Sequence, residues 1–441
     1  MALKENTKFY LALIIFSLVG QIAWVVENMY FNVFIYEAFN ASADDIALMV
    51  MLSAITATLT TLIIGALSDK IGKRKIFICA GYIIWGITIC SFALVRLDFI
   101  NKLFPMATSA SAIGVSIVIV LDCLMTFFGS SANDACFNAW LTDSTDTTNR
   151  GKAEGINAMM PLMAILVVFG GFMPFNGLEI SLKWTIIFLT IGLIVISVGI
   201  IGVFIIKDNT VKSEENNNYF KNILYGFRPK VVKENKMLYL SLIAFAIFGI
   251  SIQVFMPYLI IYYEKTLKLT NYVFIMAPAI VLAGIFTFFY GRVYDKLKFF
   301  KSVYTPLILL CLGYVFLYFF INTVCVFIGS LLMMCGYLSG MAIFGAVVRD
   351  YTPINKAGMF QGLRIVGQVL IPGLIGPFIG SRVLKNAETI LNNDGTTSFL
   401  PNQNIFLAAL IVILVVGVLI FILNLIVKKR PKILDLPISN S

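Results

Sequence analysis

Apolar side chains make up 59% of the 441 residues and charged side chains only 13%, and the formal net charge is +10. Because soluble domains carry about 25% charged residues, this composition argues against a soluble enzyme. The basic residues stand in short stretches between long apolar runs, which is typical of loops at a bilayer surface and not of a nucleic-acid-binding protein. We therefore predict an integral membrane protein surrounded by lipid.

Twelve apolar runs are long enough to cross a bilayer as helices, for which about 20 residues are needed. They cover approximately residues 9–37, 46–68, 76–96, 113–141, 153–174, 184–206, 237–263, 272–293, 303–321, 323–348, 358–383 and 405–427. A polar stretch separates the sixth run from the seventh. We predict an all-α membrane protein with an N-terminal six-helix bundle at 1–206, a central loop at 207–236 and a C-terminal six-helix bundle at 237–441.

Lysine and arginine are distributed unequally between the two sides of this arrangement. If the N-terminus is cytoplasmic, the loops on that side carry 25 of the 33 basic residues, and seven lie on the opposite side. An excess of basic residues marks cytoplasmic loops. We therefore expect a multi-pass protein of the bacterial plasma membrane with both termini in the cytoplasm. The central loop, where Phe220, Ile223, Leu224 and Phe227 recur at helical spacing, predicts an amphipathic helix on the inner surface, with a disordered linker as the alternative.

The first apolar run is rich in polar residues. Gln21, Asn28 and Asn32 fall on one helical stripe, Trp24 borders it, and Glu27 is about 100° away from Asn28. Amide groups match the hydroxyl groups of sugars, and an indole offers a stacking surface. We expect this face to line a solute cavity, with Glu27 as a coupling or substrate-binding carboxylate. The alternative is that the amides bond neighbouring helices.

A charged loop follows the second apolar run and reads GALSDKIGKRK from Gly65 to Lys75. The pattern G-x-L-x-D-K-x-G-K-R, with Asp69, Lys70, Gly72 and Arg74, resembles the signature loop between helices 2 and 3 of the major facilitator superfamily. This resemblance implies a transporter built of two six-helix halves that works by alternating access. It also implies that Asp69 caps the start of helix 11 when the cytoplasmic side is closed. The alternative is that these charges only determine topology.

The fourth apolar run carries two aspartates. Asp134 and Asn138 share a face in its cytoplasmic half, whereas Asp122 lies nearer the outside on a different face. Either aspartate can join Glu27 in holding H⁺ or Na⁺. Alternatively, Asp134 pairs with a basic residue and has a structural role.

Several motifs of the first half recur in the second, which indicates a duplication. The second copy of the loop motif contains Gly291 and Asp295 but lacks the Gly-Lys-Arg ending. The loops after the fourth and tenth runs superpose as N-[RK]-G-x-x-[EQ]-G-[IL] with one insertion. We expect both pairs of loops to act as gates, and the further gating residues are Asp143, Arg150, Arg349 and Asp350.

Two later helices supply further candidates. In the seventh run, Tyr258 follows Pro257 and can close the outer side of the cavity, or it belongs to an interfacial belt. In the eleventh run, Arg364 and Gln368 share a face. Arg364 can bind an anionic group, serve as counter-ion to a carboxylate such as Asp134, or snorkel to the interface.

The chain contains no histidine, and its seven cysteines lack metal-ligand spacing. We find no nucleotide-binding loop and no nucleophile–base set, so we predict that the protein is not an enzyme and has no cofactor or metal. The polar first helix and the aspartates of the fourth resemble the glycoside–pentoside–hexuronide cation symporters. Because the second run lacks the acidic residues usual in that branch, H⁺ is favoured over Na⁺ as coupling ion.

These observations together predict a monomeric secondary active transporter of a small polar solute, such as a sugar or glycoside, that works by proton-coupled symport. Two alternatives stay open, namely proton-driven efflux of drugs or metabolites and a non-transporting membrane sensor with a transporter fold. The helix-5 glycine motif of drug/proton antiporters is missing here, which weakens the efflux alternative.

Overall fold

The computed structural model describes residues 2–106, 109–145, 150–175, 177–207, 225–269, 271–353, 357–392 and 396–429. Twelve helical stretches in this part of the chain are long and apolar enough to cross a membrane, so the predicted number of spanning helices is confirmed. By their contacts, the residues fall into two compact units. The first unit comprises the described residues of 1–217 together with 389–399, and the second those of 218–388 and 400–441.

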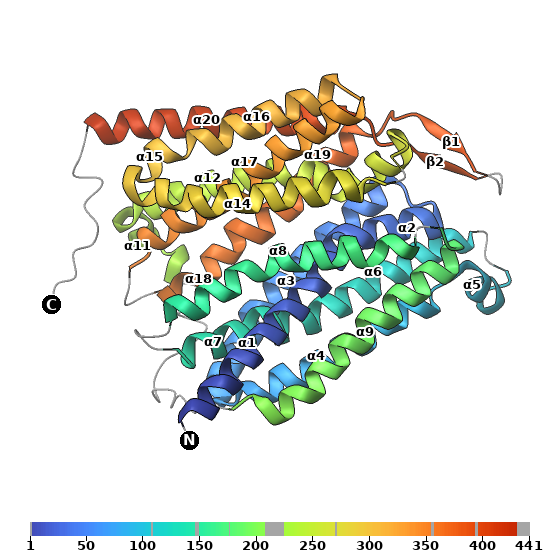
Figure 1. The fold of residues 1–441 in the computed structure, drawn as a ribbon, viewed down its shortest axis with the longest axis horizontal. Coiled ribbons are helices and arrows are strands. Elements are labelled where there is room, and N and C mark those ends of the chain that lie inside the picture. The colour runs from blue at the N-terminus through green and yellow to red at the C-terminus, as the bar shows by residue number, and fades with distance from the viewer. Residues whose placement is uncertain are drawn as a thin grey trace. The chain divides into compact units, whose positions relative to one another are not determined.

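The spanning helices of the first unit are continuous except where π-helical or 3₁₀ turns interrupt them (Figure 1). Its elements are α1 (Ala2–Val25), η1 (Val26–Tyr30), α2 (Phe31–Phe39), α3 (Ala43–Ile71), α4 (Arg74–Ser91), η2 (Phe92–Leu94), α5 (Leu97–Leu103), α6 (Ala110–Gly129), η3 (Ser130–Phe137), α7 (Asn138–Asp143), α8 (Arg150–Phe172), η4 (Met173–Phe175) and α9 (Ile180–Ile205).

The second unit is also built of helices interrupted by π-helical or 3₁₀ turns. Its elements are η5 (Tyr225–Phe227), α11 (Pro229–Glu234), α12 (Lys236–Phe255), η6 (Met256–Tyr258), α13 (Leu259–Ile261), η7 (Tyr262–Thr266), α14 (Val273–Leu297), α15 (Phe299–Ser302), α16 (Tyr304–Phe319), α17 (Thr323–Asp350), α18 (Ala357–Ile365), η9 (Val366–Leu370), α19 (Ile371–Val383) and α20 (Asn404–Lys429).

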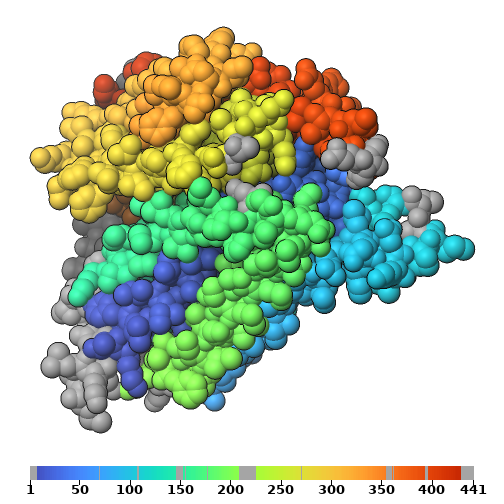
Figure 2. Space-filling view, turned by 45° about the vertical axis from the view of Figure 1, so that its right-hand side comes forward, coloured from blue at the N-terminus to red at the C-terminus, as the bar shows by residue number. Residues whose placement is uncertain are grey.

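Within the first unit, α4 packs along α9, and α1 packs against both α8 and α9. Figure 2 shows α8 and α9 on one face of this unit with α1 between them. Within the second unit, α12 packs against α19 and α20, while α14 and α16 both pack against α17. Large apolar side chains such as Phe204 and Leu193 stay exposed on the helices. This is expected where lipid, not water, surrounds the protein.

Local chemistry sets the ends of α3. The Ser42 hydroxyl accepts a hydrogen bond from the backbone N–H of Asp45, and the Asp45 carboxylate accepts one from the N–H of Ser42 at 2.9 Å. This reciprocal capping box satisfies N–H groups that a helix start leaves free. The helix ends at Gly72, whose φ of 69° places it in the left-handed region, where glycine is favoured.

A buried ion pair fixes the predicted outer end of the first unit. The Glu37 carboxylate accepts hydrogen bonds from the Lys183 ammonium and from the Trp184 indole, the latter at 3.1 Å. The pair joins the end of α2 to the start of α9. Because both charges are largely removed from solvent, removing either one would leave the other uncompensated.

Two polar segments are described separately, and the first of them departs from the all-helical expectation. A short antiparallel hairpin of β1 (Thr389–Leu391) and β2 (Thr397–Phe399) stands in the otherwise helical chain. In the central loop, Phe220, Ile223 and Leu224 lie outside the described residues, so the predicted amphipathic helix stays a prediction there. The part that is described forms the 3₁₀ turn η5 and the six-residue helix α11.

Candidate functional site

The polar residues of the first spanning helix lie around a π-helical segment. The chain is α-helical in α1, changes to a π-helix at η1, and returns to an α-helix in α2. Glu27 and Asn28 belong to η1. A π-helical turn inside an α-helix releases backbone carbonyls from their regular partners and is frequent at functional sites. The Asn28 and Asn32 amides use such carbonyls, bonding to Trp24 O at 2.7 Å and Asn28 O at 2.9 Å.

Glu27 is buried, with 7% of its surface exposed, and is held by two hydroxyl groups from other helices. Ser53 of α3 donates to Glu27 Oε1 at 2.6 Å, and Thr126 of α6 donates to the same oxygen at 2.9 Å. The second oxygen, Oε2, is buried without a hydrogen-bond partner among the described residues. Three spanning helices thus meet at one carboxyl group whose hydrogen-bond donors are neutral.

Asp122 lies close to this carboxyl group. It is 1% exposed and stands one helical turn before Thr126 on α6, so the two side chains share a helix face. The Asp122 and Glu27 carboxyl groups are near enough to interact electrostatically. In the described part of the chain, Asp122 Oδ1 has no hydrogen-bond partner. We expected Asp122 on a different face of its helix from Asp134. It nevertheless lies close to Glu27.

Asp134 lies in a second π-helical segment, η3, and belongs to the same neighbourhood. Its carboxylate accepts hydrogen bonds from Ser130 at 3.1 Å and from Asn133 at 3.2 Å. The Tyr82 hydroxyl of α4 lies 2.9 Å from Asn133 Oδ1. Asp134 also interacts electrostatically with Glu27. Among the described residues, Asp134 forms no ion pair with a lysine or arginine.

Close approach of the helices at this point depends on glycine. A Cβ atom at Gly20 would lie 2.5 Å from Asn133 Oδ1 and 2.7 Å from the Tyr82 hydroxyl oxygen. Neither distance is possible without a shift of the surrounding groups, so a larger residue at this position would force the Asn133 and Tyr82 side chains to move.

The predicted residues of the first unit differ in exposure. Asn28 and Asn138 are exposed, Gln21, Trp24 and Asp134 are half-buried, and Asn32 is completely buried. The residues of the expected stripe, Gln21, Asn28 and Asn32, thus differ in exposure, and their common role in lining a cavity stays a prediction. The half-buried Trp24 ring packs against Trp85 with a centroid distance of 5.1 Å.

The predicted residues of the second unit are described separately. Tyr258 is completely buried, and it ends the 3₁₀ turn η6 that interrupts the helix at Pro257. Arg364 closes α18 and is half-buried, and Gln368 lies in the π-helical segment η9 just after it. Candidate polar residues of spanning helices 1, 4 and 11 thus lie in π-helical turns, namely Glu27 and Asn28 in η1, Asp134 in η3 and Gln368 in η9.

Arg74 and Asp143 form an ion pair in the described part of the predicted gating loops. Arg74 Nε lies 2.5 Å from Asp143 Oδ2, and Arg74 also donates to the Ser68 hydroxyl at 3.1 Å. Lys70 and Asp295 are exposed, as are Arg349 and Asp350. The side chains of Asp69 and Arg150 lie outside the described residues. The two glycines of the loop motifs differ. A Cβ added at Gly291 would meet nothing within 4 Å, whereas Gly72 has the left-handed conformation that favours glycine.

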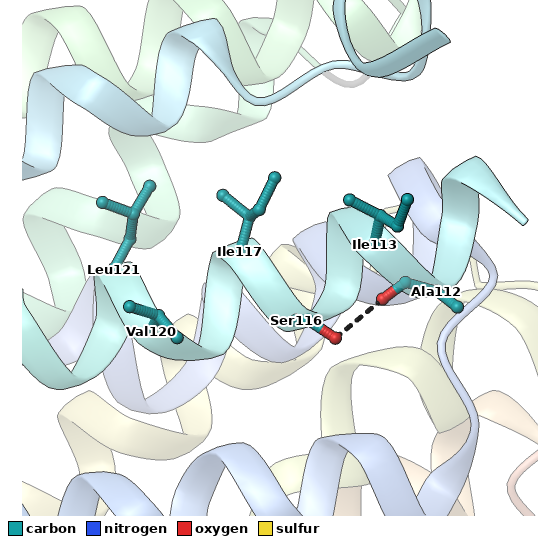
Figure 3. Close-up of a pocket in the computed structure, with 6 residues that line it drawn as sticks. All are labelled: Ala112, Ile113, Ser116, Ile117, Val120 and Leu121. Atoms are coloured by element: carbon teal, nitrogen blue, oxygen red, sulfur yellow. Dashed lines mark hydrogen bonds between the residues drawn. The ribbon is translucent and has the colours of Figure 1, made fainter. Parts of the chain in front are cut away.

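A surface pocket of about 480 Å³ lies along α6 and is lined by Ala112, Ile113, Ser116, Ile117, Val120 and Leu121. Figure 3 shows Ile113, Ile117 and Leu121 pointing to the same side of the helix. The Ser116 hydroxyl is the one polar side-chain group of the lining, and it donates to Ala112 O at 2.9 Å. This apolar surface does not have the chemistry of a polar-solute site.

Four residues of the Glu27 site carry no individual signal in the sequence. Ser53, Tyr82, Gly20 and Thr126 are single small or polar residues in apolar runs. Their roles come from contacts with other helices, which spacing along one helix does not reveal. A search for hydroxyl groups on the second and fourth runs would have selected Ser53 and Thr126 among many serines and threonines.

Comparisons with known proteins give one consistent result. The model of the family described as Major Facilitator Superfamily matches residues 10–377. A crystal structure of the nucleoside transporter NupG is similar, with a TM-score of 0.70, 13% sequence identity, and coverage of 93% of this chain and 98% of that chain. None of the curated proteins matches the sequence.

Two further solved structures share the fold. A bacterial homologue of the human lysosomal transporter Spinster, inward-facing and occupied, has a TM-score of 0.69 and 15% identity, covering 95% of this chain and 96% of that one. A D-xylose–proton symporter has a TM-score of 0.67 and 12% identity, covering 94% and 97%. At these identities the similarity shows the fold alone.

Proposed function

Because this chain belongs to the Major Facilitator Superfamily of membrane transporters, we propose that it is a secondary active transporter that takes up a small polar solute with protons. The carrying observation is the Glu27 carboxyl group. It is buried, three spanning helices meet at it, and its hydrogen-bond donors are the neutral hydroxyls of Ser53 and Thr126. A carboxylate removed from water without an opposite charge is unstable unless it binds a proton or another cation.

The solute class follows from the groups around this carboxyl group. The amides of Gln21, Asn28 and Asn138 are at least partly accessible on the first unit, and Trp24 offers a ring face. Amides pair with hydroxyl groups as donor and acceptor, and indole rings stack on the apolar faces of sugars. We propose a sugar or glycoside as the solute.

Direction and coupling are part of the proposal. In symport, a proton on Glu27 neutralises the site while the solute is bound, and both leave together on the cytoplasmic side. Release of the proton to the more alkaline side keeps the cycle running inward. Asp122 and Asp134 lie close enough to Glu27 to influence it electrostatically, and we propose that they modulate the site.

Proteoliposomes with an alkaline interior test the proposal. Purified protein is assayed for accumulation of labelled pentoses, hexoses, glycosides and nucleosides, with and without the pH gradient. Glu27→Gln is expected to abolish gradient-driven accumulation but to leave solute exchange at equal concentrations. Glu234→Gln changes an exposed carboxyl group on α11 and serves as the matched control.

Two results would overturn the proposal. Gradient-driven accumulation that survives in Glu27→Gln would remove Glu27 as the coupling group. Transport of apolar cations outward, with no sugar, glycoside or nucleoside transported inward, would assign the protein to efflux.

A further inference from the structure

Both cytoplasmic loop motifs end a helix at a residue of positive φ, although ψ differs between them, 15° at Gly72 and 178° at Lys298. In the first, α3 ends at Gly72, three residues after Asp69, with φ of 69°. In the second, α14 ends at the turn residue Lys298, three residues after Asp295, with φ of 59° and ψ of 178°. The backbone N–H groups of Gly72 and Lys298 bond to the carbonyl four residues earlier, at 2.9 and 2.8 Å.

Lys298 therefore occupies a conformation that suits glycine. A residue with a Cβ atom is strained at positive φ, and such strain persists where the surrounding structure or a function maintains it. The first loop avoids this strain by having glycine at the equivalent position. A lysine that keeps the turn despite the strain points to a role for its side chain.

The two halves also differ in the group that bonds the aspartate at the end of a nearby helix, Asp143 in the first half and Asp350 in the second. In the first half, Arg74 pairs with Asp143 at 2.5 Å. In the second half, the Tyr294 hydroxyl donates to Asp350 Oδ2 at 2.5 Å. In the second half, a neutral phenol thus bonds the aspartate, whereas an arginine does so in the first half. The basic residues of the second loop do not form an ion pair with this aspartate in the described part of the chain.

The second loop carries a basic cluster, which we define as Arg292, Lys296, Lys298 and Lys301. All four residues are exposed, and Asp295 is the one acidic residue between Gly291 and Lys301. Among the described residues, none of the four forms an ion pair with a carboxylate.

Arg292 locates the basic cluster at the membrane surface. Its guanidinium lies over the rings of Phe288 and Phe289, 5.4 and 5.5 Å from their centroids. These rings are 68% and 55% exposed on a spanning helix. Large aromatic side chains this exposed on such a helix face lipid, and a cation stacked on them lies at headgroup level.

We propose that the basic cluster binds the phosphate of an anionic phospholipid headgroup. The side of the membrane is the one that the charge distribution assigns to the cytoplasm, where anionic lipids attract juxtamembrane lysine and arginine. Arg292 offers a planar set of donors to a phosphate, and the three lysines add compact charges around it. The exposed rings beside Arg292 distinguish a lipid from a soluble phosphate, because they offer contacts to acyl chains.

Thermal unfolding of delipidated protein in detergent tests the proposal through Lys298→Gly. This substitution removes the strain and one charge together, so two opposite effects are expected. Without lipid, the melting temperature should rise by one to a few degrees, about the shift that strain relief gives in a chain of this size. With phosphatidylglycerol, the stabilisation relative to phosphatidylcholine should fall to about half that of the unaltered protein.

The control is Lys70→Gln in the first loop, which removes an exposed cation one residue after Asp69 and should keep the full phosphatidylglycerol effect. Inorganic phosphate and glycerol phosphate at matched concentration form a further arm and should not reproduce it. Native mass spectrometry counts bound phosphatidylglycerol in each variant. The proposal would be overturned if Lys70→Gln and Lys298→Gly lost the same share of the stabilisation by phosphatidylglycerol. It would also be overturned if soluble phosphate stabilised the protein fully, or if Lys298→Gly kept the whole phosphatidylglycerol effect.

Discussion

The Ser398 hydroxyl donates a hydrogen bond of 3.0 Å to the side-chain oxygen of Asn40, although the two residues are 358 positions apart. Asn40 ends the first spanning helix in the left-handed conformation, with φ of 52°. The same oxygen accepts from Asn392 at 3.1 Å, and the Asn40 amide donates to the Thr396 hydroxyl at 2.8 Å. One asparagine thus bonds three side chains of the β1–β2 hairpin.

A second contact fixes the base of the hairpin to the same helix. The Tyr36 hydroxyl donates to Phe399 O at 2.7 Å, and the two rings meet edge to face at 5.3 Å. By contacts, 389–399 belong to the first unit, whereas Glu388 and Leu400 on either side belong to the second. The hairpin therefore attaches a loop of the C-terminal half to the first helix.

This attachment predicts that a covalent link between Asn40 and Ser398 blocks transport. The family works by movement of its two halves, and a crosslinked hairpin would hold the end of helix 1 to a loop of the other half. The variant Asn40→Cys with Ser398→Cys, made after replacing the seven native cysteines, should lose transport on oxidation and regain it on reduction. Each single-cysteine variant should be insensitive to both treatments. Normal transport by the fully crosslinked protein would show that the hairpin does not need to move.

The hydroxyl of Thr126 is predicted to be needed for coupling. Thr126→Val keeps the shape but removes one of two donors to Glu27 Oε1, and an unmade hydrogen bond to a buried charged group costs about 1–3 kcal/mol. We expect gradient-driven uptake to fall about tenfold or more. Thr126→Ser keeps the hydroxyl and should retain most of the activity. Equal uptake by the valine and serine variants would mean that only the volume of the side chain matters.

The spanning helices were predictable because the bilayer demands long apolar runs, and twelve were found where twelve were expected. Glu27 was predictable for the related reason that a carboxyl group in such a run is costly and rarely accidental. Neither argument involves contacts between helices, so both need only the sequence of one helix.

The partners of Glu27 and the π-helical turns were not predictable by this reasoning. Ser53 and Thr126 meet Glu27 because three helices pack together, and η1 interrupts the regular helical spacing between Gln21 and Asn32. The hairpin does carry a signal in the sequence. The stretch from Thr389 to Phe399 reads TILNNDGTTSF, in which Asp-Gly between short β-branched segments is typical of a hairpin turn.

Gly20→Ala is predicted to destabilise the first unit. Its Cβ would lie 2.5 Å from Asn133 Oδ1, and moving Asn133 disturbs its hydrogen bond to Asp134. Overpacking of this kind typically costs about 1–3 kcal/mol. Gly170→Ala is the control, since an added Cβ there meets nothing within 4 Å, and in a helix it should be neutral or stabilising by up to about 1 kcal/mol. Melting temperatures in detergent compare the two, and equal values would refute the close approach at Gly20.

Arg74 and Asp143 are predicted to be energetically coupled. Their side chains are only 14% and 19% exposed, so removing one partner leaves a largely desolvated charge. Arg74→Gln and Asp143→Asn should each lower stability, and the double variant should lose less than the sum of the two. The expected coupling is about 0.5–3 kcal/mol.

The matched cycle in the other half uses Tyr294→Phe and Asp350→Asn, which break a bond between a phenol and a carboxylate. Because only the first pair has two opposite charges, 1 M salt should weaken the coupling of Arg74 with Asp143 more than that of Tyr294 with Asp350. Equal salt dependence in the two cycles would contradict the assignment of an ion pair to the first loop alone.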